Sequence, residues 1–458
     1  MLKRFINLFT GDSGKRTQTI IPKGKHLLSN KDISHSALKV IDRLNEANFQ
    51  AYLVGGGVRD LLLGGHPKDF DVATDATPEQ VRKLFRNSRI VGRRFRIVHV
   101  RYGREIIEVT TFRSHHQHEH VGEGTASRSA EGMLLRDNVY GDIRSDAERR
   151  DFTVNALYFH PKSAEILDFT QGAKDIERRL LRIIGDPTTR FKEDPVRMLR
   201  AVRFAAKLGF QIEEKTAAPI YKLGGLLDNI PSARLWDECL KLLMAGYSTA
   251  VFRQLLERDL FRHLFPGVAE QIAKNDQVVV LIENAMANTD KRIRADKRVT
   301  PAFIFAVMLW PEIVERQQKL VDSGVNFSQA AIQAQQQVLQ KQLNRVAIPK
   351  RFTSTMREIW DLQSQLPRRS GMRAYRTLEH PRFRAAYDFL LLREQSGENH
   401  QGLGLWWTEF QFADADTREA MIKALPAAGK GRSGRSRPRR RKPANSNRST
   451  TATPDQSE

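Results

Sequence analysis

The feature that most constrains this chain is a glycine-rich turn followed closely by two aspartates. The turn at residues 55–60 follows an apolar segment at residues 51–54, and Asp69-Phe70-Asp71 comes shortly after it. If Phe70 lies within a strand, the two-residue period puts Asp69 and Asp71 on one face and turns Phe70 to the core. Two carboxylates on one face are hard oxygen ligands, so the pattern predicts a Mg²⁺ site.

The glycines before this pair predict a place for phosphate. Gly55 and Gly56 lack Cβ atoms, so the main chain there can approach a triphosphate, and Arg59 is expected to neutralise it. The dinucleotide fingerprint is excluded because Asp60 stands where its third glycine is needed. The P-loop is excluded because the nearest match, at residues 11–15, has too few residues between its glycines.

Length and charge limit the classes of protein that fit. The 458 residues are enough for two or three domains, and a net charge of +22 attracts polyanions, with nucleic acid first and an anionic membrane second. The single cysteine, Cys239, excludes an internal disulfide and a cysteine-based zinc site and favours a reducing compartment. The first ten residues have too short an apolar run for a signal peptide, and no apolar stretch reaches the ~18 residues of a membrane span. We therefore expect a cytoplasmic protein.

The periodicity predicts an α+β fold, with an N-terminal mixed β-sheet head bearing helices, an all-helical body and a disordered basic tail. A helical pattern from Ser36 leads into the strand at 51–54, Thr77-Pro78 is typical of a helix start, and apolar runs at 97–100 and 106–112 indicate a hairpin. From residue 194 to about 425 the pattern is helical, with no convincing strand. The predicted boundaries are 1–34 for an irregular basic arm, 35–180 for the head, 181–265 for a helical neck, 266–426 for a helical body and 427–458 for the tail.

The tail is basic without compensating acids, and its Gly, Ser and Pro content cannot form a packed core. We interpret it as an arm that binds the RNA backbone, with a solubilising end as the alternative. Its candidate RNA-binding residues are Lys430, Arg432, Arg435, Arg437, Arg439, Arg440, Arg441 and Lys442. Three aromatic residues before it could stack on bases, although core packing is the more common role. They are Trp406, Trp407 and Phe410.

Five ordered motifs make the chain resemble a known family. They occupy residues 55–60, 61–71, 107–113, 149–156 and 193–201. Together they are similar to the class II nucleotidyltransferases of the DNA polymerase beta superfamily, which include bacterial poly(A) polymerases and CCA-adding enzymes. Residues 91–100 resemble the segment associated with bacterial poly(A) polymerase I. The resemblance thus implies template-independent transfer of AMP from ATP to RNA 3′ ends, with catalysis in the head, nucleotide recognition in the neck and RNA binding in the helical body. A CCA-adding enzyme is the alternative, and a non-catalytic basic RNA-binding protein is the alternative from another class.

The resemblance also implies roles for the acidic residues. Asp69 and Asp71 would hold two Mg²⁺ ions, one lowering the pKa of the attacking hydroxyl and one carrying the charge of the leaving phosphates. A third carboxylate is expected. Asp151, within an Arg-Arg-Asp motif, is the first choice as a functional residue, and Glu108 is its rival for direct metal contact.

Four arginines would contact the nucleotide. Arg149 and Arg150, from the Arg-Arg-Asp motif, would meet phosphate oxygens. Arg200 and Arg203, on the helix after residue 194, would face the triphosphate or support the base-reading residues. Partners implied are RNA 3′ ends of mRNA and other transcripts, with RNA-decay and RNA-chaperone proteins as further candidates.

Asp194 and Arg197 would read the base. They lie three residues apart at the first turn of a predicted helix, so their side chains fall on one face. A carboxylate that accepts from the exocyclic amine, beside a guanidinium that donates to the ring nitrogen, matches adenine. Cytosine presents the same pattern and guanine and uracil the reverse, so this pair excludes G and U but does not separate A from C.

Overall fold

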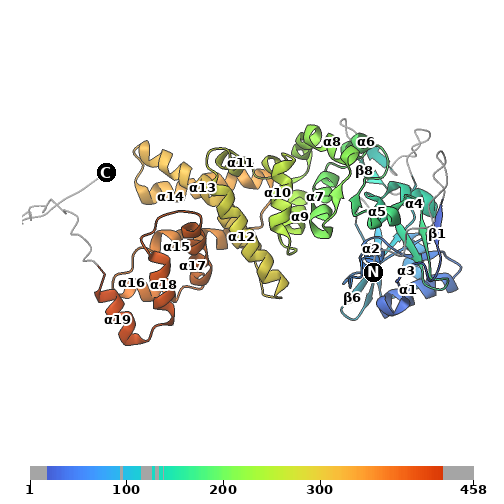
Figure 1. Cartoon of the computed structure of the whole chain (residues 1–458), viewed down its shortest axis with the longest axis horizontal. Coiled ribbons are helices and arrows are strands. Elements are labelled where there is room, and N and C mark those ends of the chain that lie inside the picture. Colours follow the sequence, from blue (N-terminus) through green and yellow to red (C-terminus); the bar gives the residue numbers. More distant parts are fainter. Residues whose placement is uncertain (1–17, 93–95, 115–125, 129–133, 138, 426–458) are drawn as a thin grey trace, which may run out of the picture.

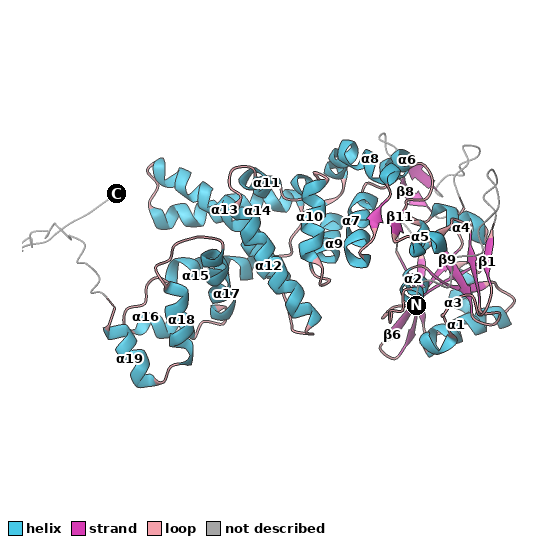
Figure 2. Cartoon of the chain, viewed as in Figure 1, coloured by secondary structure: helices cyan, strands magenta, loops and turns pink. Residues whose placement is uncertain are grey.

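The computed structural model describes residues 18–92, 96–114, 126–128, 134–137 and 139–425. The predicted RNA-binding tail residues from Lys430 to Lys442 lie outside the described residues. The molecule is elongated, with a β-sheet head at one end and helices in series toward the other (Figures 1 and 2). None of the described helices combines the length and the apolar character needed to cross a bilayer.

An eight-stranded mixed sheet forms the head, in the order β1-β10-β9-β2-β3-β6-β5-β4. Only the β3–β6 pair in this sheet is parallel. Two shorter sheets pair β11 with β12 and β7 with β8. The strands are β1 (Thr19–Ile21), β2 (Ala51–Val54), β3 (Asp71–Thr74), β4 (Ser88–Val91), β5 (Ile97–Tyr102), β6 (Glu105–Thr111), β7 (Ala126–Arg128), β8 (Leu134–Asp137), β9 (Leu157–His160), β10 (Glu165–Asp168), β11 (Leu180–Leu181) and β12 (Gln211–Ile212).

One face of the sheet is covered by α1 (His35–Glu46) and α3 (Pro78–Leu84). Ser34 begins α1 by accepting a hydrogen bond from the Ala37 amide, and the apolar residues of α1 recur at helical spacing and are buried. Thr77 and Gln80 form a reciprocal capping box at the start of α3. These predicted helices are confirmed.

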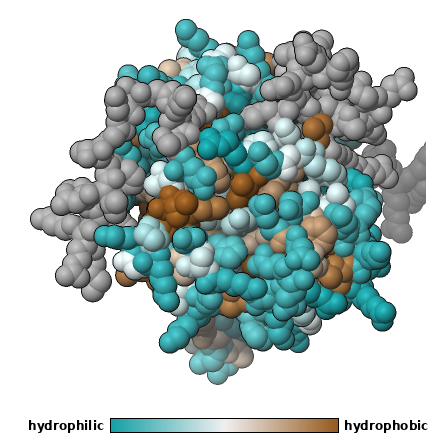
Figure 3. Space-filling model, turned by 90° about the vertical axis from the view of Figure 1, so that its right-hand side faces the viewer, coloured by the Kyte–Doolittle hydropathy of each residue, from teal (hydrophilic) through white to brown (hydrophobic). Residues whose placement is uncertain are grey.

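On the opposite face, the described elements pack over the half of the sheet that contains β2 and β9. There α4 (Ile143–Arg149) packs Ala147 against a small core that includes Val54, Ala73, Phe112 and Tyr158. The catalytic candidates lie at the border of this covered half. The end view of the head in Figure 3 is dominated by hydrophilic residues, with a few hydrophobic patches between them.

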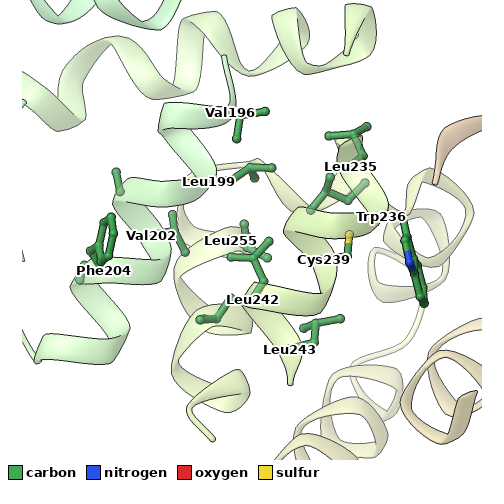
Figure 4. Packing of buried hydrophobic residues seen from close by; sticks show 14 of the residues in the cluster. Val196, Leu199, Val202, Phe204, Leu235, Trp236, Cys239, Leu242, Leu243 and Leu255 are labelled. Atoms are coloured by element: carbon green, nitrogen blue, oxygen red, sulfur yellow. The ribbon is translucent and has the colours of Figure 1, made fainter. Parts of the chain in front are cut away.

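Helices make up the rest of the described chain. The neck core is formed where α7, α9 and α10 meet, with Leu199 and Val202 of α7 facing Leu242 and Leu255 (Figure 4). Cys239 is buried within α9, as the helical pattern predicted. The remaining helices are α2 (Gly56–Leu62), α5 (Gly172–Glu177), α6 (Pro187–Glu193), α7 (Val196–Leu208), α8 (Glu214–Leu223), α9 (Ser232–Leu243), α10 (Ser248–Glu257), α11 (Pro266–Ile272), α12 (Gln277–Arg294), α13 (Pro301–Asp322), α14 (Phe327–Arg345), α15 (Lys350–Gln365), α16 (Met372–Leu378), α17 (Phe383–Gln395), α18 (Leu403–Phe412) and α19 (Ala415–Lys423), with short 3₁₀ turns η2 (Asn30–Asp32), η3 (Thr153–Asn155), η4 (Gly224–Asn229) and η5 (Phe261–His263).

The structure corrects three details of the prediction. The arm is not irregular throughout, because β1 pairs with β10 at the sheet edge. A strand does occur after residue 194, because β12 pairs with β11. Asp69 and Phe70 precede β3 rather than lying in it, although Phe70 is buried as predicted.

Candidate active site

The glycine turn, Asp71 and Arg150 lie together. Gly55 connects β2 to α2 with a φ of 78°, a left-handed conformation that favours glycine. A Cβ on Gly55 would stand 3.5 Å from Arg150 Nη1 and 3.8 Å from Asp71 Oδ2. The turn therefore lies directly against the Asp71 carboxylate and the Arg150 guanidinium, as expected for a site that binds a metal ion together with a phosphate group.

Three carboxylates raise the negative charge here. Asp71 and Glu108 are register partners on the parallel strands β3 and β6. Burial and then the negative charge of Glu108 raise the pKa of Asp71 to about 6, with Asp69 adding to the effect and Arg150 opposing it. No three His, Cys, Asp or Glu side chains of the described residues already converge as a metal-ligand set. Mg²⁺ keeps waters and substrate phosphates among its ligands, so two carboxylates with a third nearby fit it.

Asp151 already uses both of its carboxylate oxygens. Oδ2 accepts from Arg200 Nε at 2.8 Å and Nη2 at 2.6 Å, and Oδ1 accepts from the Phe152 amide at 2.8 Å and Asn155 Nδ2 at 3.0 Å. Burial opposes ionisation, but Arg200 and these hydrogen bonds hold the pKa of Asp151 well below its usual range. Asp151 thus links the head to α7, whereas Glu108 is the residue beside Asp71.

Two buried side chains fix the orientation of Arg150. Its Nε donates to Asp146 Oδ2 at 3.2 Å and to the Tyr158 hydroxyl at 3.0 Å, and that hydroxyl donates to Asp146 at 2.7 Å. Asp146 and Tyr158 are buried, so the guanidinium is fixed in orientation. Arg150 reaches the Gly55 turn from this support.

Arg149 lies among other positive charges. Burial and then Arg113, Arg190 and Arg197 lower the pKa of Arg149 to about 9, with Glu193 opposing. Such crowding favours binding of an anion, which would offset the repulsion. The structure thus brings Arg150 beside Asp71, whereas Arg149 lies among Arg113, Arg190 and Arg197.

Arg190 connects this loop to the next helix. It donates through Nη2 to the carbonyls of Arg149 and Arg150, the latter at 2.8 Å, and through Nη1 to Glu193 at 2.7 Å. Glu193 also accepts from Arg197 at 3.1 Å. The Arg-Arg-Asp loop and the start of α7 are therefore joined by charge-assisted hydrogen bonds.

Asp194 and Arg197 are near each other in the chain but have separate partners. Asp194 is the C-cap of α6 in an extended conformation, one residue before the N-cap of α7, so it does not lie in the first helical turn. Its Oδ2 accepts from Arg234 at 2.8 Å, whereas Arg197 donates to Glu193 and to the Arg190 carbonyl. The structure brings both residues to the α6–α7 corner without joining their side chains in a hydrogen bond.

Arg59 lies next to the glycine turn, with its Nη2 atom 3.5 Å from where a Cβ on Gly56 would stand, and it is hydrogen-bonded within the fold. Its guanidinium is buried and donates to Asp60 at 2.5 and 2.7 Å and to Asn155 Oδ1 at 2.5 Å. Asn155 in turn donates to Asp151, and Asp60 also accepts from Lys207 of α7 at 2.9 Å. The result is a hydrogen-bonded chain from α2 through the Arg-Arg-Asp loop to α7.

The aromatic ring of Phe204 packs where α2, the Arg-Arg-Asp loop and α7 meet. The guanidiniums of Arg59, Arg200 and Arg203 lie 5.2, 5.3 and 4.7 Å from the centre of the Phe204 ring, which also meets Phe152 edge-on. These are cation–π distances. Arg200, Arg203 and Phe204 all belong to α7, so Arg59 is the one of these three guanidiniums that reaches the ring from the head. Arg200 is joined to the head through Asp151, and contact of Arg200 and Arg203 with the triphosphate stays a prediction.

Some residues of the site had no signal in the sequence. Arg190 and Arg234 act through partners 40 residues away, so neither a local motif nor a helical period identifies them. Asn155 lies in the motif at residues 149–156, but its bond to Arg59, 96 residues away, had no signal. Farther away, Trp407 and Phe410 are buried in a separate core of the helical body. Trp407 and Phe410 therefore pack in a core, which was the alternative considered for these aromatic residues.

Comparison with known proteins gives a consistent result. Three family models match, namely the poly A polymerase head domain at residues 51–182, the probable RNA and SrmB-binding site of polymerase A at residues 209–272, and the polymerase A arginine-rich C-terminus at residues 323–443. The poly(A) polymerase I of Escherichia coli is 50% identical over 430 residues, which are 93% of this chain and 92% of that protein. A CCA-adding enzyme of Lactobacillus helveticus is 38% identical over 229 residues, or 50% of this chain and 55% of the enzyme.

Solved structures show the same fold. The Bacillus stearothermophilus CCA-adding enzyme in complex with CTP aligns with a TM-score of 0.50 and 26% identity, covering 85% of this chain and 82% of that one. The Thermotoga maritima CCA-adding enzyme complexed with tRNA aligns with a TM-score of 0.55 and 20% identity, covering 87% and 89%, a likeness of fold alone. The predicted fold class and the predicted resemblance are confirmed. The chain belongs to the poly(A) polymerase I family.

Proposed function

We propose that this chain is a template-independent polynucleotide adenylyltransferase that adds AMP from ATP to RNA 3′ ends. The observation that carries the proposal is the group of carboxylates around Asp71, whose pKa is raised to about 6, directly beside the Gly55 turn and Arg150. Binding of RNA alone gives no reason to place carboxylates next to a polyanion. The proposal is also supported by relatives named poly(A) polymerase I over nearly the whole chain, whereas the CCA-adding relative matches half of it.

The reaction forms one bond and breaks one. The RNA 3′ hydroxyl oxygen attacks the α-phosphorus of ATP, the bond to the β-phosphate breaks, and pyrophosphate leaves. Mg²⁺ ions held by Asp69 and Asp71 would lower the pKa of that hydroxyl and neutralise charge on the phosphates. Glu108 is our choice for the third carboxylate, because both oxygens of Asp151 are already engaged.

The arginines divide the remaining work. Arg149 and Arg150 are proposed to meet phosphate oxygens, and the crowding of Arg149 by other guanidiniums supports an anion there. Asp194 and Arg197 are proposed to exchange their present partners for the Watson–Crick edge of adenine. Such an exchange keeps the buried charges hydrogen-bonded in both states.

The proposed RNA substrates are the 3′ ends of mRNA and other transcripts in the cytoplasm. The matched RNA-binding model at residues 209–272 supports placing part of this function on α8 to α11. The basic tail residues are proposed to bind RNA phosphates, and RNA-decay or RNA-chaperone proteins are proposed partners.

The product decides between the two enzyme candidates. Purified protein with Mg²⁺ and labelled RNA should give long, heterogeneous A tails from ATP and little product from CTP. A CCA-adding enzyme would prefer transfer RNA, require CTP first and stop after three additions. A sharp product of that length would overturn poly(A) addition and leave the fold and metal site standing.

The metal assignment has its own test. Asp69→Asn and Asp71→Asn should each lower the rate of pyrophosphate release by several orders of magnitude while RNA binding persists, because one such interaction contributes ~3 kcal/mol or more to the transition state. The control is Asp237→Asn, at an exposed position on α9. Normal turnover in either variant would end the two-metal assignment, whereas wild-type protein that releases no pyrophosphate would leave a non-catalytic RNA-binding protein as the better description.

A further inference from the structure

A row of polar side chains crosses the sheet from the carboxylate site to its edge. The strand register aligns Asp71 of β3 with Glu108 of β6, Glu108 with His99 of β5, and His99 with Arg89 of β4. Directly opposed residues on neighbouring strands lie on the same face of a sheet. His99 Nε2 stands 3.4 Å from Glu108 Oε1. The side chains of His99 and Glu108 are therefore in contact, next to the candidate metal ligand Asp71.

This row lies on the open face. The alternate residues Val98, Val100, Ile107 and Val109 are buried in the core under α1 and α3. The Glu108 side chain is 48% exposed and that of His99 is 31% exposed, although the Nε2 atom of His99 is itself buried. Arg89 is exposed, and so is Arg101, two residues beyond His99 on the same face.

The other side of Asp71 is closed. There the same face is covered by the small core of α4 with Val54, Ala73 and Tyr158. The Gly55 turn and Arg150 also lie on this side, next to β2 and β9. The carboxylate site thus has one side with phosphate-binding groups and one side that opens onto β6, β5 and β4.

The in-line geometry of the reaction indicates which substrate lies on the open side of the carboxylate site. The attacking oxygen and the leaving oxygen lie on opposite sides of the phosphorus. If the leaving phosphates are held at Gly55 and Arg150, the 3′ hydroxyl must arrive from the β6 side. This step rests on the proposed function, which puts the triphosphate at the glycine turn.

We propose that the last nucleotides of the RNA lie across β6, β5 and β4 on this open face. Arg89 and Arg101 contact RNA phosphates, which supplies the charge that the polyanion needs. His99 holds the Glu108 carboxylate on the RNA side and is a positioning residue for the 3′ end. The occupant is single-stranded RNA, because its terminus has to reach the carboxylates.

Cross-linking tests the placement directly. The full-length protein is mixed with a short RNA that carries 4-thiouridine at its 3′ terminus, irradiated, and digested for peptide mapping. We expect cross-linked peptides from β4 to β6. Cross-links confined to the neck and the helical body would overturn the proposal.

Matched variants test the energetics. Arg89→Ala and Arg101→Ala should each raise the KM for a short RNA several-fold and flatten the salt dependence of binding by roughly 0.7 in log–log slope, with the KM for ATP unchanged. The control is Lys83→Ala, which removes one positive charge from α3 on the covered side of the sheet. If the arginine variants behave as Lys83→Ala does, the proposal fails.

The role of His99 is separable from folding. His99→Ala should raise the KM for RNA and lower kcat together by about tenfold. His99→Gln retains a hydrogen-bond donor and should recover most of that loss, which a purely structural role would not predict. If His99→Ala and His99→Gln are equally impaired, the proposal that His99 positions Glu108 is wrong. Wild-type protein that releases no pyrophosphate would instead defeat the proposed function, so the two failures are distinguishable.

Discussion

At the scale of single residues, Asp71 carries an unfavourable charge in the metal-free protein. Its pKa is raised to about 6 by burial and by Glu108, so the ionised form destabilises the fold above that pH. The native state binds the proton more tightly than the unfolded state, and stability falls as pH rises from about 4 to 6. A cation bound beside Asp71 would offset this penalty.

Asp71→Asn should therefore stabilise the metal-free protein while abolishing activity. We expect the free energy of unfolding to rise by about 1–2 kcal/mol at pH 8, because one pKa unit corresponds to about 1.4 kcal/mol and the side chain is only partly shielded from water. Denaturant unfolding at pH 8 and pH 4 measures it, and the gain should vanish at pH 4. Asp237→Asn is the control, and an equal gain there would show a nonspecific charge effect.

Base choice is a second residue-scale prediction. Arg197→Ala should raise incorporation of GTP and UTP relative to ATP by tenfold or more, because the donor that guanine and uracil cannot satisfy is gone. Arg253→Ala, at an exposed ion pair on α10, is the control. Unchanged relative rates for the four nucleotides would remove Arg197 from base reading.

These residues also show what a sequence can and cannot predict about a site. Asp69, Asp71 and Arg150 belong to short motifs whose chemistry is readable, and the structure brings Asp71 and Arg150 together. Asn155 bonds Arg59, 96 residues away, and no local pattern encodes that contact. Arg59 belongs to the glycine motif, and its predicted binding of phosphate stays a prediction. Its buried hydrogen bond to Asn155 depends on the tertiary structure and had no signal in the sequence.

At the scale of elements, the junction of α2, the Arg-Arg-Asp loop and α7 couples the head to the neck. Asn155 is its central group, because it accepts from Arg59 and donates to Asp151, which in turn holds Arg200. All of these bonds are at least partly buried. A change at Asn155 therefore affects two charged groups at once.

Asn155→Ala should lower the free energy of unfolding by about 2–3 kcal/mol, because two hydrogen bonds to charged groups lose their partner. It should also raise the KM for ATP, since Asp151 and Arg200 lose their fixed orientation. Denaturant unfolding and steady-state kinetics measure the two effects. The control is Asn30→Ala, which removes a hydrogen bond to the Pro161 carbonyl far from the junction. A kinetic change without a stability change would argue that Asn155 contacts substrate instead.

Elements close in sequence were predictable and distant pairings were not. The helices α1 and α3 and the β5–β6 hairpin follow from local periods and turn residues. The edge strand β1 was not predicted, because its partner β10 is distant in the sequence, with Thr19 opposite Asp168. The three residues of β1 are also too few to show a strand pattern. The strands β11 and β12 are two residues each and depend wholly on each other.

At the scale of the whole molecule, the proposed RNA-binding segments are distributed along an elongated chain. The sheet head lies at one end and the helical body extends away from it (Figure 1). The matched RNA-binding model covers residues 209–272, and the arginine-rich model extends to residue 443. We expect a long RNA to bind the head, neck and tail together, whereas a short one reaches the head only. Affinity and turnover should respond differently to removal of the tail.

Deleting the residues after Pro426 removes the eight Lys and Arg residues between 430 and 442. The deletion should weaken binding of long RNA and flatten the slope of log affinity against log salt by roughly 0.7 for each phosphate that the tail no longer neutralises. AMP transfer to a saturating short RNA should persist, because the carboxylates and arginines of the head are intact. A matched control replaces these eight residues by Gln, which keeps the length and removes the charge, and it should behave as the deletion does. An unchanged slope in both proteins would mean that the tail serves solubility rather than RNA binding.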